Sequence, residues 1–226
     1  MRFFFVFFFC ILSTPLFAQQ KNKLVFHHLF TNKPLVFNEN YILKNKDTVS
    51  IQTFKYYISS IQFLKNKKVV WKEKKSVHLI DEENSPSKII DLDNMPDGIE
   101  FDEISFNIGI DSATNYAGVQ GGDLDPTKGM YWTWQNGYIN FKIEGKSTFC
   151  KTRNNAFQFH IGGYENGLAT LQKISLKINN KKPLEINLDV EKLIEQINLS
   201  TQNEIMQPCK EAVEIANKLS LLFSIQ

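Results

Sequence analysis

The 226-residue chain lacks the short motifs that identify the common enzyme classes. It contains no Gly-x-Ser-x-Gly turn, no His-Glu-x-x-His helix, no phosphate-binding loop and no dinucleotide-binding fingerprint. Beyond its N-terminal segment it also lacks any apolar run that approaches the roughly 20 residues of a membrane-spanning helix. We therefore expect a non-catalytic protein with no transmembrane segment.

Cysteines are few, and the basic and acidic residues are nearly equal in number. The chain has 26 basic and 24 acidic residues, and a formal net charge of +2 does not indicate a nucleic-acid partner. Of three cysteines, Cys10 lies in the N-terminal segment, which leaves Cys150 and Cys209 for a single disulfide in an oxidising compartment. A pair of soft metal ligands or a reactive thiol are the alternatives, but CxxC spacing is absent and the disulfide is favoured.

The N-terminal segment has the pattern of an export signal. Arg2 precedes an apolar run over residues 3–12, and small residues lead to Ala18. This pattern predicts a signal peptide over residues 1–18, cleaved after Ala18, and a single periplasmic or secreted domain over residues 19–226. A lipid anchor at Cys10 is disfavoured because Phe9 is too bulky for a lipoprotein cleavage site.

Alternation of apolar and polar residues predicts that most of the mature chain is β-strand. The strands are expected at residues 23–30, 69–80, 104–110, 139–143, 157–161, 174–178 and 184–188. Residues 54–63 fit a helix or a strand, but their β-branched and aromatic content favours a strand with a bulge near Ser59. Apolar spacing predicts a short helix capped by Asp189 and a longer one from Pro208. The fold class is therefore mainly β, an antiparallel β-sandwich with C-terminal helical additions.

Two of the three tryptophans lie in the short sequence Trp132-Thr133-Trp134. On an extended backbone both indoles would point to one face and form an aromatic platform. Such a platform either packs against a second sheet or binds something outside the protein. The binding interpretation describes a cell-envelope module that recognises carbohydrate or protein through the exposed tryptophan pair.

A long glycine-rich loop leads into this tryptophan pair. Periodicity stops between residues 109 and 130, and loops of this length in a compact domain are typically functional or disordered. Its oxygen-bearing residues Asp111, Asn115, Asp123 and Asp125 are candidate calcium ligands. Turn and helix-capping roles are favoured over calcium, since no EF-hand spacing is present.

The four histidines are the candidate ligands for a transition metal. His160 falls on the polar face of its predicted strand, next to a Gly-Gly break, which suits a ligand. His27 and His28 are adjacent, so a strand points them to opposite faces. His78 lies in a lysine-rich hairpin and is expected to be exposed. Each histidine taken singly is more often structural than a ligand.

Several segments together resemble the MbnP-like family, which is named for periplasmic proteins associated with the copper-scavenging peptide methanobactin. These segments are Tyr56-Tyr57-Ile58-Ser59, Asn107 to Asn115, Leu124-Asp125-Pro126, Gly129-Met130-Tyr131-Trp132-Thr133-Trp134, Gly137-Tyr138, Glu144-Gly145, Phe159-His160-Ile161-Gly162-Gly163 and Ile215-Ala216-Asn217. The resemblance covers nearly the whole mature chain.

The resemblance implies a periplasmic β-sandwich that binds copper. In related copper proteins two histidine nitrogens act with a tryptophan that a partner dihaem enzyme has oxidised to kynurenine. Kynurenine has an arylamine nitrogen that can bind a metal, whereas the indole lone pair belongs to the ring. Carried onto this chain, Trp132 or Trp134 is the oxidisable position and His160 and His28 are the histidine ligands. No histidine lies within two residues of either tryptophan, which departs from one way of building such sites.

Overall fold

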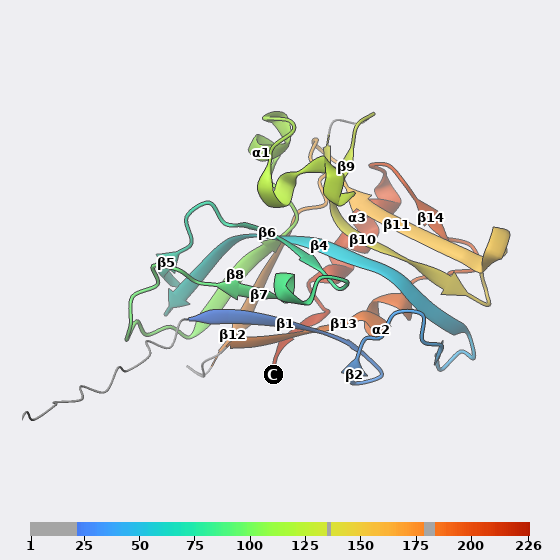
Figure 1. The fold of residues 1–226 in the computed structure, drawn as a ribbon, viewed down its shortest axis with the longest axis horizontal. Helices are drawn as coiled ribbons and strands as arrows, with labels where there is room; N and C mark the ends of the chain where they lie inside the picture. Colours follow the sequence, from blue (N-terminus) through green and yellow to red (C-terminus); the bar gives the residue numbers. More distant parts are fainter. Residues whose placement is uncertain (1–21, 135–136, 179–183) are drawn as a thin grey trace, which may run out of the picture.

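The computed structural model describes residues 22–134, 137–178 and 184–226, so the predicted signal peptide, residues 1–18, lies outside the described residues. Within those ranges no helix combines the length and the apolar character needed to cross a membrane. The described chain is mainly β, as predicted, and its strands form two sheets that face each other (Figure 1).

The smaller sheet has the strand order β15-β13-β1-β2, with β7 paired to β1. Its strands are β1 (Lys23–Phe30), β2 (Lys33–Pro34), β7 (Ile89–Asp91), β13 (Leu184–Asp189) and β15 (Phe223–Ile225). The pairing of β1 with β13 is parallel, which brings the first and the last long strands of the domain together. The sheets are therefore mixed, and the predicted antiparallel arrangement holds for most but not all pairs.

The larger sheet has the order β12-β8-β4-β10-β11-β14, with shorter strands added to β4 and β10. Its strands are β3 (Tyr41–Ile42), β4 (Thr48–Lys65), β5 (Lys68–Lys72), β6 (Val77–Asp81), β8 (Glu103–Ile108), β9 (Tyr131–Trp132), β10 (Gly137–Ser147), β11 (Ala156–Gly162), β12 (Gln172–Lys177) and β14 (Glu204–Ile205). The pairing of β11 with β14 is also parallel.

Strand β4 contains the ambiguous segment 54–63, and the strand prediction is confirmed. Its pairing with β8 shifts register between Ser59 and Gln62, and Ser60 has a φ of 56°. The bulge changes which residues face the core, which explains why the apolar spacing there does not follow a strict period of two.

The space between the two sheets holds the main core. Phe26 of β1 packs edge-to-face against Tyr56 of β4 and Phe106 of β8, so the contacts cross from one sheet to the other. A second, smaller core lies on the opposite face of the larger sheet, beneath the loop between β8 and β10. Its members are Tyr57, Leu79, Ile110, Leu124, Met130, Trp132, Tyr138 and Ile139.

Both predicted C-terminal helices are present. Helix α2 (Val190–Ile194) begins after Asp189, whose side chain accepts a hydrogen bond from the Lys192 amide as an N-cap does. Helix α3 begins two residues later than predicted, after Cys209. The remaining helical elements are α1 (Ser112–Tyr116), α3 (Lys210–Leu219) and the 3₁₀ turns η1 (Ser85–Lys88), η2 (Gly122–Leu124), η3 (Pro126–Lys128) and η4 (Arg153–Asn155).

Candidate functional site

His160 lies on the outer face of the larger sheet, away from the main core. Along β11, Phe157, Phe159 and Ile161 point into the main core and are fully buried, so alternation points His160 to the other face. The histidine is nevertheless only 6% exposed. His160 is therefore a buried histidine on the outer face of the sheet.

Glu144 of β10 binds this imidazole. His160 pairs with Lys142 in the ladder, and Glu144 lies two residues further along the same face, with its Oε1 2.6 Å from His160 Nε2. Glu144 also accepts a hydrogen bond from Thr53 Oγ1 at 2.9 Å, and Lys142 Nζ lies 3.4 Å from it. The bond from His160, helped by Thr53 and Lys142, lowers the pKa of Glu144 to about 2 against the effect of burial. The carboxylate is therefore ionised, and His160 Nε2 donates to it.

This arrangement fixes the chemistry of the imidazole. Because Nε2 carries the proton, Nδ1 of a neutral His160 has a free lone pair, and no hydrogen bond to Nδ1 occurs within the described residues. A histidine that donates one nitrogen to a carboxylate and keeps the other free has the form of a metal ligand with its supporting acid.

Trp132 lies on the same face of the sheet as His160. Its indole packs directly over Gly162, which follows His160 by two residues on β11 and so presents its face to the same side. A Cβ at Gly162 would come within 2.7 Å of Trp132 Cζ3. The glycine is therefore required for the tryptophan to lie where it does.

The hairpin of β9 and β10 holds Trp132 in this position. Trp132 pairs with Gly137, and the Ile139 amide donates to the Met130 carbonyl at 2.9 Å. Trp132 is 1% exposed, and its buried Nε1–H has no hydrogen-bond partner among the residues that the structure describes. An unpaired buried donor costs about 1–3 kcal/mol, so it requires a physical explanation.

Trp134 does not share this environment. Strand β9 ends at Trp132, the chain turns at Thr133 and Trp134, and the Trp134 side chain is 64% exposed. The predicted platform of two indoles on one face is wrong, because the extended backbone on which it depends stops after the first tryptophan.

The structure does not bring His28 and His160 together. His28 faces the main core from β1, where its ring packs against Phe54 and Tyr56 on the inner face of β4. The larger sheet therefore lies between the two histidines. Both nitrogens of His28 are engaged, Nδ1 with Glu82 and Nε2 with the Tyr56 hydroxyl at 2.8 Å. Burial lowers the pKa of His28, so the ring is neutral, with Nδ1 donating to Glu82 and Nε2 accepting from Tyr56.

The other two histidines also face glutamates. His27 Nε2 lies 3.5 Å from Glu185, and His78 Nε2 lies 2.9 Å from Glu73. The prediction that His78 is simply exposed is wrong, because its hydrogen bonds to Glu73 hold it against the hairpin. Across the described ranges, no group of three or more histidine, cysteine, aspartate or glutamate side chains is arranged to hold a metal ion.

The candidate calcium ligands have local roles. Asp111 caps α1 through the Thr114 amide, and Asp125 caps η3 through Thr127. Asp123 binds the Leu79 amide and the Lys128 ammonium. The buried Asn115 side chain donates to the Ile110 and Asp111 carbonyls and accepts from the Tyr138 amide. The capping interpretation is confirmed, and the structure gives calcium no support.

The predicted disulfide between Cys150 and Cys209 is absent, and both cysteines are free. Cys150 Sγ donates to the Leu199 carbonyl at 3.4 Å, while Cys209 Sγ accepts from the Ala212 amide at 3.4 Å as the N-cap of α3. Burial raises the pKa of both thiols, which also argues against a reactive thiolate. Each sulfur thus has a local partner in place of the other.

Glu144 and Gly162 define the surroundings of His160 and Trp132. In the sequence they stand out only as members of segments that resemble the MbnP-like family, with no role in the site. Alternation along residues 139–143 already placed the polar residues of β10 on one face. The missing information was the pairing of β10 with β11, which sets Glu144 near His160.

Comparison with known proteins agrees with this architecture. A protein-family model described as MbnP matches residues 19–207. The solved structure of MbnP from Methylosinus trichosporium superposes with a TM-score of 0.58 at 13% sequence identity, covering 91% of this chain and 98% of that chain. At this identity the likeness concerns the fold alone. A search of curated protein sequences gives no match.

Proposed function

This chain belongs to the MbnP family, and from that premise we propose that it is an exported, non-catalytic protein that binds copper in the periplasm or outside the cell. The observation that carries the proposal is the placement of His160 and Trp132 on one face of the larger sheet. His160 offers a free imidazole nitrogen there, supported by the ionised Glu144.

The unmodified side chains fit copper only in part. Copper favours imidazole nitrogen and soft or amine donors, and this face supplies a single imidazole. His28 is separated from it by the sheet and has both nitrogens engaged, so we leave it out of the proposed site. The thioether of Met130, in the same small core as Trp132, is a soft donor nearby.

Oxidation of Trp132 to kynurenine would supply the missing nitrogen donor. The buried Nε1–H of Trp132 has no partner within the described part of the chain. Oxidative cleavage of the bond between Cγ and Cδ1, followed by hydrolysis that releases Cδ1 as formate, would convert this indole nitrogen into an arylamine with an available lone pair. Trp132 is favoured over Trp134 for this role because it packs over the strand of His160, while Trp134 is exposed to solvent. The oxidant would come from a partner dihaem enzyme in the same compartment.

The test is the intact mass and copper content of the protein exported by its native host. The proposal predicts a net exchange of one carbon for one oxygen atom, mapped by peptide sequencing to Trp132, and copper that co-purifies with the modified protein. His160→Ala should lose copper while keeping the modification, and Trp132→Phe should lose both.

Two matched substitutions serve as controls. Trp134→Phe and His78→Ala alter the same residue types outside the proposed site, and both should retain copper and the mass change. Unmodified Trp132 together with copper-free protein would sink the proposal. A modified Trp132 without copper would refute the copper role and leave the oxidation.

A further inference from the structure

The Glu144 carboxylate has a second partner, on the strand that flanks β10 on its other side. Thr53 Oγ1 donates to its Oε2 at 2.9 Å, while His160 Nε2 donates to its Oε1 at 2.6 Å. The three side chains come from the neighbouring strands β4, β10 and β11. Because each oxygen has its own donor, a carboxylate that turns out of this orientation loses at least one hydrogen bond.

A bulge in β4 brings Thr53 opposite Glu144. Glu144 pairs with Thr53, but the next residue, Gly145, pairs with Ile51, so Gln52 is the extra residue of the bulge. A Cβ at Gly145 would collide with a backbone carbonyl of β4, so the strands approach each other closely here. Bulges are frequent beside functional sites, where they redirect a side chain. This one keeps Thr53 on the outer face with Glu144 while Ile51 enters the main core.

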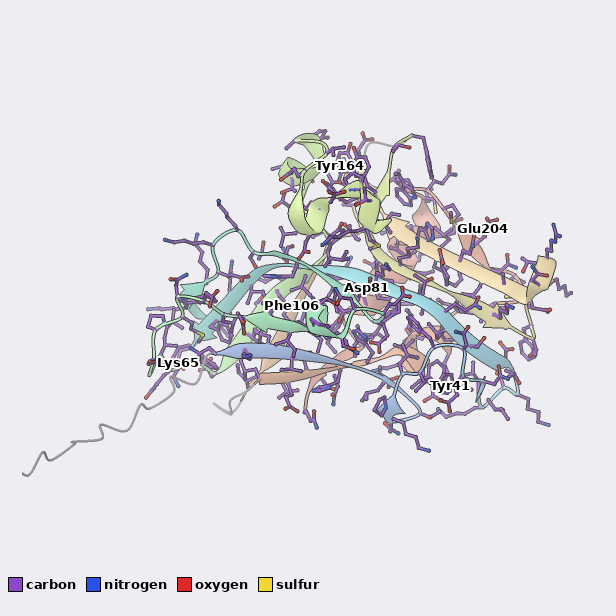
Figure 2. All side chains as sticks on the ribbon, in the orientation of Figure 1. Tyr41, Lys65, Asp81, Phe106, Tyr164 and Glu204 are labelled. Carbon is purple, nitrogen blue, oxygen red and sulfur yellow. The ribbon has the colours of Figure 1, made fainter. Side chains whose placement is uncertain are left out.

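The lysines beside Glu144 already have partners. One row of side chains crosses four neighbouring strands on this face, in the order Asp81, Lys55, Lys142 and His160. Figure 2 labels the first of them, Asp81 on β6. Lys55 Nζ binds Asp81 at 2.8 Å, so Lys142 is the lysine that remains for Glu144, at 3.4 Å. Lys142 also donates to the Gly129 carbonyl at 3.4 Å, which leaves Thr53 as the closer donor to the carboxylate.

The other ring nitrogen of His160, Nδ1, is open to a ligand. In the described part of the chain, the buried side-chain polar atoms without a hydrogen-bond partner are His27 Nε2 and Trp132 Nε1. His160 Nδ1 makes no hydrogen bond to a described residue, yet it is not one of these buried atoms. The small exposed part of His160, 6% of the residue, therefore includes Nδ1.

We propose that Thr53 is a positioning residue for His160. Its hydroxyl holds the Glu144 carboxylate in the orientation that accepts from Nε2, so the proton of the neutral ring stays on Nε2 and Nδ1 is the nitrogen presented to the metal. Without this bond the carboxylate can turn, and the proton can move to Nδ1. Groups that support a ligand in this way change the affinity of a metal site without touching the metal. The identity of the metal, copper, rests on the proposed function, whereas the position of the proton does not.

The direct measurement is nitrogen-15 NMR of the neutral His160 ring in the metal-free mature protein, assigned by comparison with His160→Gln. This spectrum distinguishes a protonated ring nitrogen from an unprotonated one. We expect the proton on Nε2 in the parent protein. Thr53→Val has nearly the same shape without the hydroxyl, and it should raise the ratio of the Nδ1–H form to the Nε2–H form about three- to tenfold. Thr53→Ser, which keeps the hydroxyl, should restore the parent ratio.

Thr48→Val is the matched control. Thr48 is another half-buried threonine of β4, and its hydroxyl makes no hydrogen bond to a described residue. In protein exported by the native host, Thr53→Val should also lower the copper affinity about three- to tenfold, less than the loss typical of a residue that bonds a ligand directly. Thr53→Ser and Thr48→Val should both keep the parent affinity.

Several results would overturn the proposal. These are a proton on Nδ1 in the parent protein, the parent ratio in Thr53→Val, or an equal change in Thr48→Val, which would show a general effect of removing a hydroxyl from β4. A changed ratio in Thr53→Val with unchanged copper affinity would exclude Nδ1 as the metal-binding nitrogen. Parent protein without copper would refute the proposed function alone, because the NMR measurement requires no metal and still decides the role of Thr53.

Discussion

Replacing Gly162 by alanine tests the placement of Trp132 over the strand of His160. The added Cβ would lie 2.7 Å from Trp132 Cζ3, 3.1 Å from its Cη2, and 2.7 Å from the Tyr138 carbonyl oxygen. Trp132 is fully buried and the carbonyl belongs to the neighbouring strand β10, so neither can yield cheaply. Overpacking of this kind costs about 1–3 kcal/mol, and two close contacts place Gly162→Ala near the upper end.

The assay is urea denaturation of the mature protein, together with its melting temperature. For a domain of this size, about 2–3 kcal/mol corresponds to a decrease of roughly 4–12 °C in melting temperature. Gly121→Ala is the matched control, because no atom lies within 4 Å of its added Cβ and its φ is negative. We expect this control to stay within about 0.5 kcal/mol of the parent protein.

A double-mutant cycle separates the two close contacts. Trp132→Phe replaces the indole above Gly162 with a smaller ring. Part of the loss of stability caused by Gly162→Ala should therefore disappear in that background, while the contact with the Tyr138 carbonyl remains. A coupling of about 0.5 kcal/mol or more is expected. Additive effects, or a Gly162→Ala variant as stable as Gly121→Ala, would refute the packing of the indole on β11.

Three further predictions concern the buried polar groups. Glu144→Gln should destabilise the protein by about 1–2 kcal/mol at pH 7, after discounting for partial solvation. Folding lowers the pKa of Glu144 from 4.5 to about 2, so the stabilisation is fully present above pH 4.5 and should fade as the pH falls towards 2. A difference in unfolding free energy between the two proteins that does not change with pH, measured by urea denaturation, would contradict this. Tyr56→Phe leaves Nε2 of His28 without its donor and should cost about 1–2 kcal/mol in the same assay. Cys150 and Cys209 should both titrate as thiols in the unfolded protein, and reductant should not change the melting temperature; a disulfide-linked peptide in a non-reducing digest would contradict this.

Local patterns in the sequence were sufficient for most of the fold. Alternation along residues 157–161 assigned both faces of β11 correctly, and the capping role of Asp189 placed the start of α2. The bulge in β4 was also predicted, because β-branched and aromatic residues outweighed a spacing that fitted a helix. Each of these features depends on neighbours in the chain, and such neighbours are visible in a single sequence.

The errors concern which side chains meet and where strands end. The two thiols were expected to pair because export made a disulfide plausible, yet each one found a closer backbone partner. The tryptophan pair was expected to share a face, but the turn at Thr133 separates the two indoles. The spacing of the two tryptophans does not show that the strand ends at Trp132. That end is set by the pairing of β9 with β10, which joins Trp132 to Gly137.

The sequence alone determined the β-rich class, the strand faces, the C-terminal helices and the family resemblance, since all of these depend on the order of residue types along the chain. Tertiary structure alone decided which candidates share a site. The two-sheet arrangement separates His28 from His160, strand pairing gives His160 its carboxylate Glu144, and the absence of a side chain at Gly162 admits Trp132 to the same face. These outcomes follow from strand register and close packing, which are set by interactions between segments far apart in the chain.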